Sequence, residues 1–206
     1  MSDQHSARRV VANVTLSLDG RINGPGGEHD MGWIVPHAVS DGARDHMMRV
    51  TEPATTVLLG RKNYAGFGGF WPSVADMADA DPRDRAFSRW LDRTDKIVFS
   101  STLTSTTWQN SRLATAGPAE TVAALRAADG GDIIVLASIS IIRQLLQADL
   151  VDRLSVMLCP VVVGGGERLF DDSIPAGDWG LAGSWTTETG ATNLLYDRTR
   201  AHGKVS

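Results

Sequence analysis

Short apolar runs alternate with amphipathic segments along most of this chain. The most continuous run is residues 133–136, which are uncharged and mainly β-branched, as in a strand buried on both faces. From Ser138 onward the apolar positions follow a helical period, with the four apolar residues of 141–146 on one stripe. This spacing predicts a buried strand that passes directly into a helix.

The same criteria predict elements along the rest of the chain. The glycine-rich, aromatic segment 66–72 is expected to be a connection, and residues 73–82 a surface insertion. Segments 179–188 and 192–200 are expected to pair as a closing hairpin. Further strands are expected at 10–18, 53–59, 95–103, 113–114 and 151–158, and helices at 39–50, from 60 onward, at 86–91 and at 118–128.

This order of elements predicts the fold class. Strands and helices alternate through residue 147, and strands follow alone. We therefore expect an α/β fold with a mostly parallel central sheet flanked by helices and with antiparallel C-terminal edge strands. One domain is expected over residues 9–200, with a flexible N-terminus at 1–8 and a tail at 201–206.

Amino-acid composition and net charge limit the classes of binding partner that the chain is expected to have. With 42% apolar and 21% charged residues, the chain has the balance of a soluble globular domain. A net charge of −4 without clustered Lys and Arg argues against a nucleic-acid partner. No apolar stretch suits a signal peptide or a membrane span, so we expect no membrane partner and a cytoplasmic protein. The single Cys159, in an apolar run, predicts core packing in a reducing compartment, and no metal site is predicted.

The turn at residues 137–140 is a candidate phosphate site. Ala137, Ser138 and Ser140 are small and lie where a strand enters a helix. The first N–H groups of a helix have no internal partner and can bind phosphate. The alternative is that Ser138 or Ser140 only caps the helix.

A second strand-to-helix junction carries two cations, Arg61 and Lys62, between Gly60 and Asn63. Cations are unfavourable beside the positive end of a helix unless an anion is held there, so this pair predicts a bound phosphate. The alternative is that they are solvated surface charges, which cost only about a few tenths of a kcal/mol. In a parallel sheet both junctions fall at the strand ends, where ligands bind.

Other candidates have equally plain alternatives. Ser100, Ser101 and Thr102 follow a strand and either donate to a phosphate or serve the next turn. Trp33 follows the glycine-rich loop at 23–32 and either walls a pocket or plugs the edge of the core. Two aspartates one helical turn apart, Asp41 and Asp45, either meet a substrate or only favour the helix dipole.

Taken in order, these segments resemble the dihydrofolate reductase-like superfamily. They are more similar to the reductase domain of the bifunctional riboflavin-biosynthesis deaminase-reductase and its stand-alone relatives. The resemblance covers about residues 9–200 and rests on residues 17–20, 58–64, 96–103, 150–154 and 160–166.

The resemblance implies an NADPH site at the strand ends. It places the nicotinamide near Leu18 and the substrate between the nicotinamide, Trp33 and the helix at 40–50. It also makes Asp19, Asp41 and Asp45 candidate proton donors or substrate anchors. The residues that it assigns to the cofactor are Ala12, Leu18, Gly60, Arg61, Lys62, Asn63, Ser100, Ser101, Thr102, Leu136, Ala137, Ser138, Ile139 and Ser140.

The chain departs from this family at the pyrophosphate turn. Similar proteins have Gly-Gly or Gly-Ser there, whereas this chain has residues 137–140 as Ala-Ser-Ile-Ser. The side chains of Ala137 and Ile139 are expected to crowd a diphosphate, while the Ser138 hydroxyl adds a donor. No acidic residue is placed that would grip a pterin, and no deaminase domain is expected, so neither dihydrofolate nor the bifunctional reaction is predicted.

We therefore expect an NADPH-dependent reductase that transfers hydride to a small cyclic C=N or C=O compound in secondary metabolism, and that forms a homodimer. Two alternatives stay open. Ala137 and Ile139 motivate a non-redox enzyme that uses the same cleft. The apolar segment 161–166 and the C-terminal hairpin motivate a non-catalytic nucleotide-binding or structural dimer.

Overall fold

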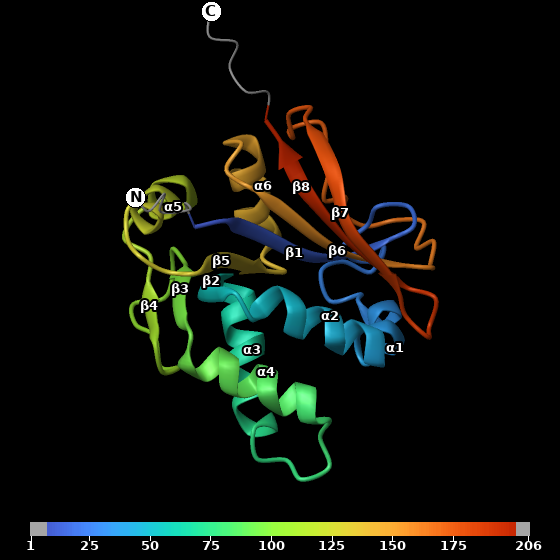
Figure 1. The fold of residues 1–206 in the computed structure, drawn as a ribbon, viewed down its shortest axis with the longest axis horizontal. Coiled ribbons are helices and arrows are strands. Elements are labelled where there is room, and N and C mark those ends of the chain that lie inside the picture. The colour runs from blue at the N-terminus through green and yellow to red at the C-terminus, as the bar shows by residue number, and fades with distance from the viewer. Residues whose placement is uncertain (1–7, 201–206) are drawn as a thin grey trace, which may run out of the picture.

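The computed structural model describes residues 8–200, and within them eight strands form one sheet (Figure 1). The expectations for residues 1–7 and 201–206 lie outside the described residues. The strands are β1 (Val10–Ser17), β2 (Ala54–Gly60), β3 (Asp95–Phe99), β4 (Ser111–Leu113), β5 (Asp132–Leu136), β6 (Arg153–Cys159), β7 (Asp178–Thr186) and β8 (Thr192–Thr199).

Helices fill most of the connections between the first six strands. They are the 3-10 helix η1 (Gly32–Ile34) and the α-helices α1 (Val35–Ala38), α2 (Asp41–Thr51), α3 (Arg61–Val74), α4 (Pro82–Arg93), α5 (Pro118–Arg126) and α6 (Ile139–Gln147). None of these helices, all within residues 8–200, has the length and apolar character that a membrane crossing requires.

The sheet has the order β4-β3-β2-β5-β1-β6-β8-β7. The strands from β4 to β6 are mutually parallel, whereas β8 is antiparallel to β6 and β7 antiparallel to β8. The predicted parallel centre with an antiparallel C-terminal edge is therefore confirmed.

Helices cover both faces of the sheet (Figure 1). On one face Val50 of α2, Tyr64 of α3 and Leu91 of α4 pack into a single core cluster. On the other face Val122 of α5 and Leu145 of α6 pack into a second cluster. Burial on both sides accounts for the uncharged composition of the central strands.

β2 and β5 are adjacent in the sheet, but the helices that follow them cover opposite faces. Helix α3 leaves the end of β2 toward one face, and α6 leaves the end of β5 toward the other. Open α/β sheets bind ligands at such a switch point, beyond the carboxyl ends of the strands.

The prediction of a connection at residues 66–72 is wrong, because α3 runs through this segment with Pro72 inside it. Three glycines suggested a break, since each costs about 1 kcal/mol relative to alanine in a helix. However, Tyr64, Phe67 and Trp71 follow a helical spacing and pack against the core. Burial of three aromatic side chains outweighs the glycine cost.

One residue before β1 is buried, and one helix begins earlier than expected. Arg8, assigned from the sequence to a flexible segment, is only 7% exposed, and its guanidinium donates to the Thr56 hydroxyl at 2.7 Å. The helix expected at 86–91 begins at Pro82, because Asp81 caps it by accepting the Arg83 N–H at 2.8 Å. Both anchors are polar contacts that apolar periodicity does not reveal.

Candidate active site

The two predicted phosphate corners meet at the switch point. Ser138 is 2% exposed, and its hydroxyl accepts the Gly60 N–H at 2.9 Å and donates to the Leu136 carbonyl at 3.1 Å. A Cβ on Gly60 would lie 3.8 Å from the Ser138 side chain, so the two turns lie close together. Ser138 precedes α6 but makes no side-chain capping bond to it. Its hydroxyl therefore joins β2 to β5 and does not neutralise the positive end of α6.

The turn keeps a backbone conformation that favours glycine. Ala137 has a φ of +47°, in the left-handed region, and its N–H donates to the Asn13 carbonyl at 2.9 Å. An L-residue in this region costs about 1–2 kcal/mol. The side chain of Ile139 packs against the core on the α6 face, and Ser140 is exposed. The effect of Ala137 therefore includes backbone strain as well as the space that its methyl group takes.

Arg61 and Lys62 form the first turn of α3, and both are exposed. The Lys62 ammonium pairs with the Glu28 carboxylate, which lies in the glycine-rich loop. This hydrogen-bonded ion pair, with smaller contributions from His29 and Arg61, lowers the pKa of Glu28. An anion is thus held beside the N-terminus of α3, where negative charge is favourable. A phosphate at this corner would compete with Glu28.

The hydroxyl corner after β3 serves its own turn. The Ser100 hydroxyl accepts the N–H groups of Thr102 at 3.1 Å and Leu103 at 2.9 Å. Ser101 and Thr102 are exposed. Ser100 therefore has the geometry of the turn alternative, while its two neighbours remain open to solvent.

Asp19 follows β1 and holds a distant segment. Its carboxylate accepts the Ser17 hydroxyl at 2.7 Å and the N–H groups of Val163 and Gly164 at 3.1 Å each. The Ser17 bond, followed by the Val163 N–H, lowers the pKa of Asp19 to about 2. Asp19 is therefore ionised at neutral pH, and its geometry is that of a residue that positions the glycine segment at 164–166.

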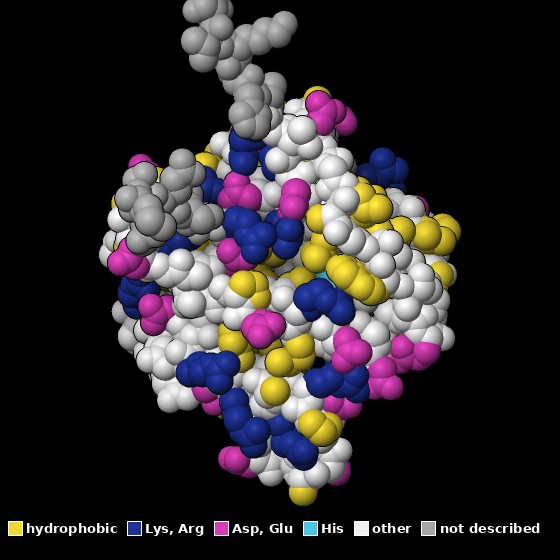
Figure 2. Space-filling view, viewed as in Figure 1, with side chains coloured by type: hydrophobic (Ala, Val, Ile, Leu, Met, Phe, Trp, Pro, Cys, Tyr) yellow, Lys and Arg dark blue, Asp and Glu magenta, His cyan; other side chains and the backbone are white. Residues whose placement is uncertain are grey.

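Asp41 and Asp45 lie on the exposed side of α2, where both pair with Arg83 of α4. Asp81 joins them, 2.8 Å from Arg83, and the hydrogen bonds that this guanidinium donates to Asp81, Asp45 and Asp41 raise its pKa. Figure 2 shows basic and acidic side chains side by side over this part of the molecule, with apolar side chains among them. The structure therefore brings the two aspartates to α4 and not to the strand-end turns.

The remaining predicted contacts are mostly apolar. Trp33 lies in η1 and packs against a small core cluster that contains Cys159, whose burial raises the pKa of the thiol to about 11. Ala12 and Leu136 are buried on opposite faces of the sheet, and Leu18 is exposed beyond the end of β1. Of these four residues only Leu18 presents its side chain openly to solvent.

A cavity of about 170 Å³ lies between α2, α4 and the face of β1 that these helices cover. Its charged residues are Arg44, Arg83 and Asp84, and Arg44 pairs with Asp84 at 2.9 Å. The polar and apolar wall residues that concern its chemistry are Asn13, Thr15, His46, Asn193, Met47, Met48, Trp71, Phe87 and Met157. The cavity thus combines an apolar surface with a few neutral polar groups, as ligand sites do.

His46 connects α2 to the sheet through buried polar contacts. Its Nε2 lies 2.8 Å from the Ser155 hydroxyl, which donates to the Asn13 Oδ1 at 2.8 Å. Burial, with a smaller contribution from Arg49, lowers the pKa of His46 to about 4, so the imidazole is neutral at pH 7. The backbone carbonyl of Asn13 accepts the Ala137 N–H, so this residue of β1 contacts both the cavity and the strand-end turn.

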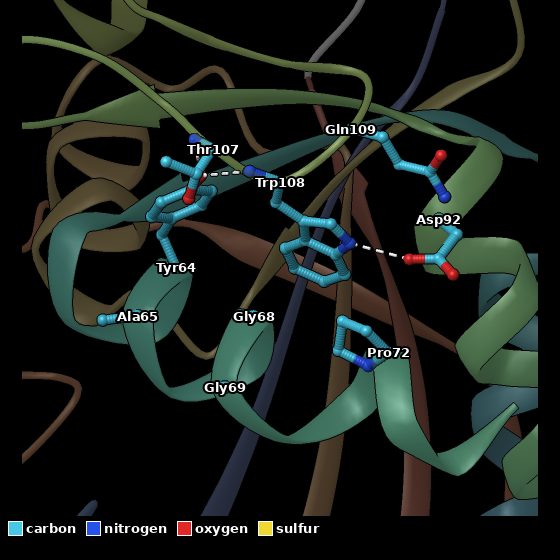
Figure 3. Close-up of a pocket in the computed structure, with 9 residues that line it drawn as sticks. All are labelled: Tyr64, Ala65, Gly68, Gly69, Pro72, Asp92, Thr107, Trp108 and Gln109. Carbon is cyan, nitrogen blue, oxygen red and sulfur yellow. Dashed lines mark hydrogen bonds between the residues drawn. The ribbon is translucent and has the colours of Figure 1, made fainter.

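A second cleft, of about 600 Å³, lies between α3 and residues 107–109 (Figure 3). The Tyr64 hydroxyl accepts the N–H groups of Thr107 and Trp108 at 2.9 Å each. The Trp108 indole donates to Asp92 of α4 at 2.7 Å. These bonds fix the helix whose first turn carries the two cations.

Sequence reasoning did not single out His46, Asn13, Ser155 or Asn193. Two of them carry a local signal, since His46 falls on the apolar stripe of α2 and Asn13 interrupts a β-branched strand. Asn193 carries none, because it reaches the cavity only through the pairing of β8 with β6, opposite Met157.

The mostly parallel sheet, covered by helices on both faces and closed by an antiparallel C-terminal edge, has the architecture of the dihydrofolate reductase-like fold class. The family model described as the RibD C-terminal domain matches residues 8–192. The chain therefore belongs to the RibD C-terminal domain family.

Known proteins agree with this placement. The chain is 26% identical over 200 residues to the uncharacterized protein YyaP of Bacillus subtilis (strain 168), covering 95% of this chain and 98% of that protein. Its fold is similar to a putative riboflavin biosynthesis protein from Shewanella sp. PV-4 (TM-score 0.69, 19% identity, 93% and 99% of the chains). It is also similar to dihydrofolate reductase from Enterococcus faecalis complexed with NADP(H) (TM-score 0.55, 15% identity, 93% and 97%). At these identities the two structures establish the fold.

Proposed function

We propose that this protein is an NADPH-dependent reductase that transfers hydride to a small cyclic compound with a C=N or C=O bond. The observation that carries the proposal is the junction of β2 and β5, where Ser138 and Gly60 bring two helix N-termini together beside Arg61 and Lys62. The similar dihydrofolate reductase structure, which holds NADP(H), supports the choice of cofactor.

The donor set at this junction fits the phosphates of a dinucleotide. The first N–H groups of α3 and α6 supply neutral donors, and the left-handed backbone at Ala137 is the conformation of a glycine turn. Arg61 offers a planar fork suited to a phosphate monoester such as the 2′-phosphate, and Lys62 offers a point charge. Ser138 holds the two helix ends at a fixed spacing.

When bound, NADPH supplies the hydride, and the chain supplies the position of the acceptor. The cavity adjoins the strand-end turn through Asn13, so a substrate held there lies beside the proposed cofactor site. Hydride transfer requires donor and acceptor carbons about 3–3.5 Å apart. Among the described residues the one carboxylate of the cavity wall, Asp84, is paired with Arg44, so we propose that the proton comes from water.

A calorimetric titration with NADPH and NADH tests this proposal. The wild type is expected to bind NADPH with a micromolar Kd, about −8 kcal/mol. Arg61→Ala should weaken NADPH at least tenfold and NADH less, because NADH lacks the 2′-phosphate. Arg93→Ala is the matched control, since Arg93 ends α4 just before β3 begins and so lies at the opposite edge of the sheet.

Two results would count against the proposal. Failure of both cofactors to bind at millimolar concentration would overturn the reductase assignment and return the alternatives of a non-redox enzyme or a structural dimer. Equal losses of NADPH and NADH in Arg61→Ala would remove Arg61 from the 2′-phosphate.

We also propose that the protein is a homodimer. In support, β7 is the terminal strand of the sheet, so no strand within residues 8–200 pairs with its outer side, and it exposes Leu181 and Trp185. Light scattering should give twice the monomer mass for the wild type and a smaller mass for Leu181→Asp. A monomeric wild type at micromolar concentration would reject this assembly.

A further inference from the structure

Two polar atoms of the cavity residues have no partner in the protein. Within residues 8–200 four buried side-chain polar atoms make no hydrogen bond, and His46 Nδ1 and Asn193 Oδ1 are two of them. His46 is 3% exposed and Asn193 is 0% exposed. A buried group without a partner costs about 1–3 kcal/mol. Because both residues also line the cavity, a ligand that reaches these atoms would supply the missing hydrogen bonds.

Both atoms are hydrogen-bond acceptors. The Ser155 hydroxyl spends its proton on Asn13, so its oxygen accepts the His46 Nε2–H. In a neutral imidazole this leaves a lone pair on Nδ1. The Asn193 amide nitrogen donates to the Gly42 carbonyl at 3.2 Å. This bond identifies the unpartnered atom of the Asn193 amide as its oxygen, which is an acceptor. The complement of two acceptors is a ligand with N–H or O–H donors.

The charges around the cavity favour an uncharged ligand. Arg44 pairs with Asp84, and Arg83 pairs with the carboxylates of Asp41, Asp45 and Asp81. An anion entering the cavity would lose its hydration and face acceptor atoms, and a cation would find these four carboxylates already paired with arginines. A neutral donor group avoids both costs.

The apolar walls favour a single ring. Trp71 and Phe87 meet edge to face with their ring centroids 4.6 Å apart, and Met47 and Met48 line the adjoining wall. The volume of about 170 Å³ lies below the roughly 300 Å³ at which drug-sized sites begin. A ligand larger than one substituted ring would extend out of the cavity.

We propose that this cavity binds an uncharged ring compound that bears N–H donors, such as a primary carboxamide, with His46 Nδ1 and Asn193 Oδ1 as the acceptors. His46 and Asn193 are then specificity-determining residues. The inference deepens the proposed function by naming a substrate class, and it rests on that function only in calling the ligand a substrate.

Three probes that share one ring test the proposal by nuclear magnetic resonance on protein labelled with ¹⁵N-histidine. Benzamide carries N–H donors, N,N-dimethylbenzamide carries none, and benzoate is anionic. Benzamide is expected to bind and to shift the His46 Nδ1 resonance, and the other two probes to bind at least tenfold more weakly. Repeating the titration with saturating NADPH prevents binding of the probes at the nicotinamide position.

A matched pair of variants completes the test. Asn193→Leu should weaken benzamide at least tenfold while changing N,N-dimethylbenzamide little, and Gln109→Leu, at an exposed residue of the other cleft, should change neither. If Asn193→Leu fails to fold, the His46 resonance of the wild type still decides.

The possible outcomes separate this inference from the reductase proposal. No binding of benzamide, equal binding of the dimethyl compound, or a His46 resonance that does not move would each overturn the inference. Benzamide binding at His46 without any NADPH binding would uphold the cavity and reject the reductase. NADPH binding without benzamide binding would do the reverse.

Discussion

His46 should make the protein sensitive to acid. Burial beneath α2, with Arg49 adding a smaller effect, lowers its pKa from 6.5 to about 4. Between these values the unfolded chain binds a proton that the folded chain does not, so stability must fall as pH drops from 6.5 to 4. The difference corresponds to about 3 kcal/mol, and at 3% exposure little solvent screening reduces it. The imidazole also contacts two neutral groups, the Ser155 hydroxyl and the Trp185 ring, whose centroid lies 6.0 Å away.

Urea unfolding of the wild type and His46→Gln at pH 7 and pH 4 measures this contribution. At pH 7 the variant should be less stable by about 1 kcal/mol, because it disturbs the hydrogen bond to Ser155. At pH 4 the wild type alone carries the protonation penalty, so the difference between the proteins should move by about 3 kcal/mol in favour of the variant. His29→Gln, at an exposed residue, is the control and should follow the wild type. A difference between wild type and His46→Gln that is the same at both pH values would refute the reasoning.

Three further predictions concern the strand-end turns and the core. Ala137→Gly removes about 1–2 kcal/mol of left-handed backbone strain, whereas the greater freedom of glycine in the unfolded chain costs about 0.5–1 kcal/mol of stability. The melting temperature should therefore rise, and NADPH should bind at least as tightly. A lower melting temperature would contradict this. Ser138→Ala strips the Gly60 N–H of its acceptor and should cost about 1–3 kcal/mol in urea unfolding and weaken NADPH, whereas unchanged values would deny Ser138 its joining role. Burial lowers the pKa of Lys96 from 10.5 to about 8. Between pH 8 and 10.5 the unfolded chain binds a proton that the folded chain does not, so stability should rise as the pH increases through this interval. Lys96→Met should abolish the rise, and a rise that persists in the variant would reject the assignment.

The sequence by itself determined the fold class and the location of the strand-end turns. Uncharged runs of strand length, alternating with helical stripes, are local patterns, and connection rules convert their order into a parallel sheet. The same rules bring the residues after each strand to one edge, so the segments at Gly60 and Ala137 are predicted to lie at the same edge of the sheet. Local patterning failed at residues 66–72, where glycine propensity opposed an aromatic stripe and tertiary burial decided for the helix.

Only the tertiary structure decided what each polar side chain does. Asp41 and Asp45 have the spacing of a functional pair, but both lie on the exposed side of α2 and pair with Arg83 of α4. Serine is a common helix-capping residue, but Ser138 instead accepts the Gly60 N–H at the end of the adjacent strand β2. Asn193 becomes a cavity residue because β8 pairs antiparallel with β6. A hydrogen bond depends on distance and direction between groups far apart in the chain, and periodicity within a segment carries neither.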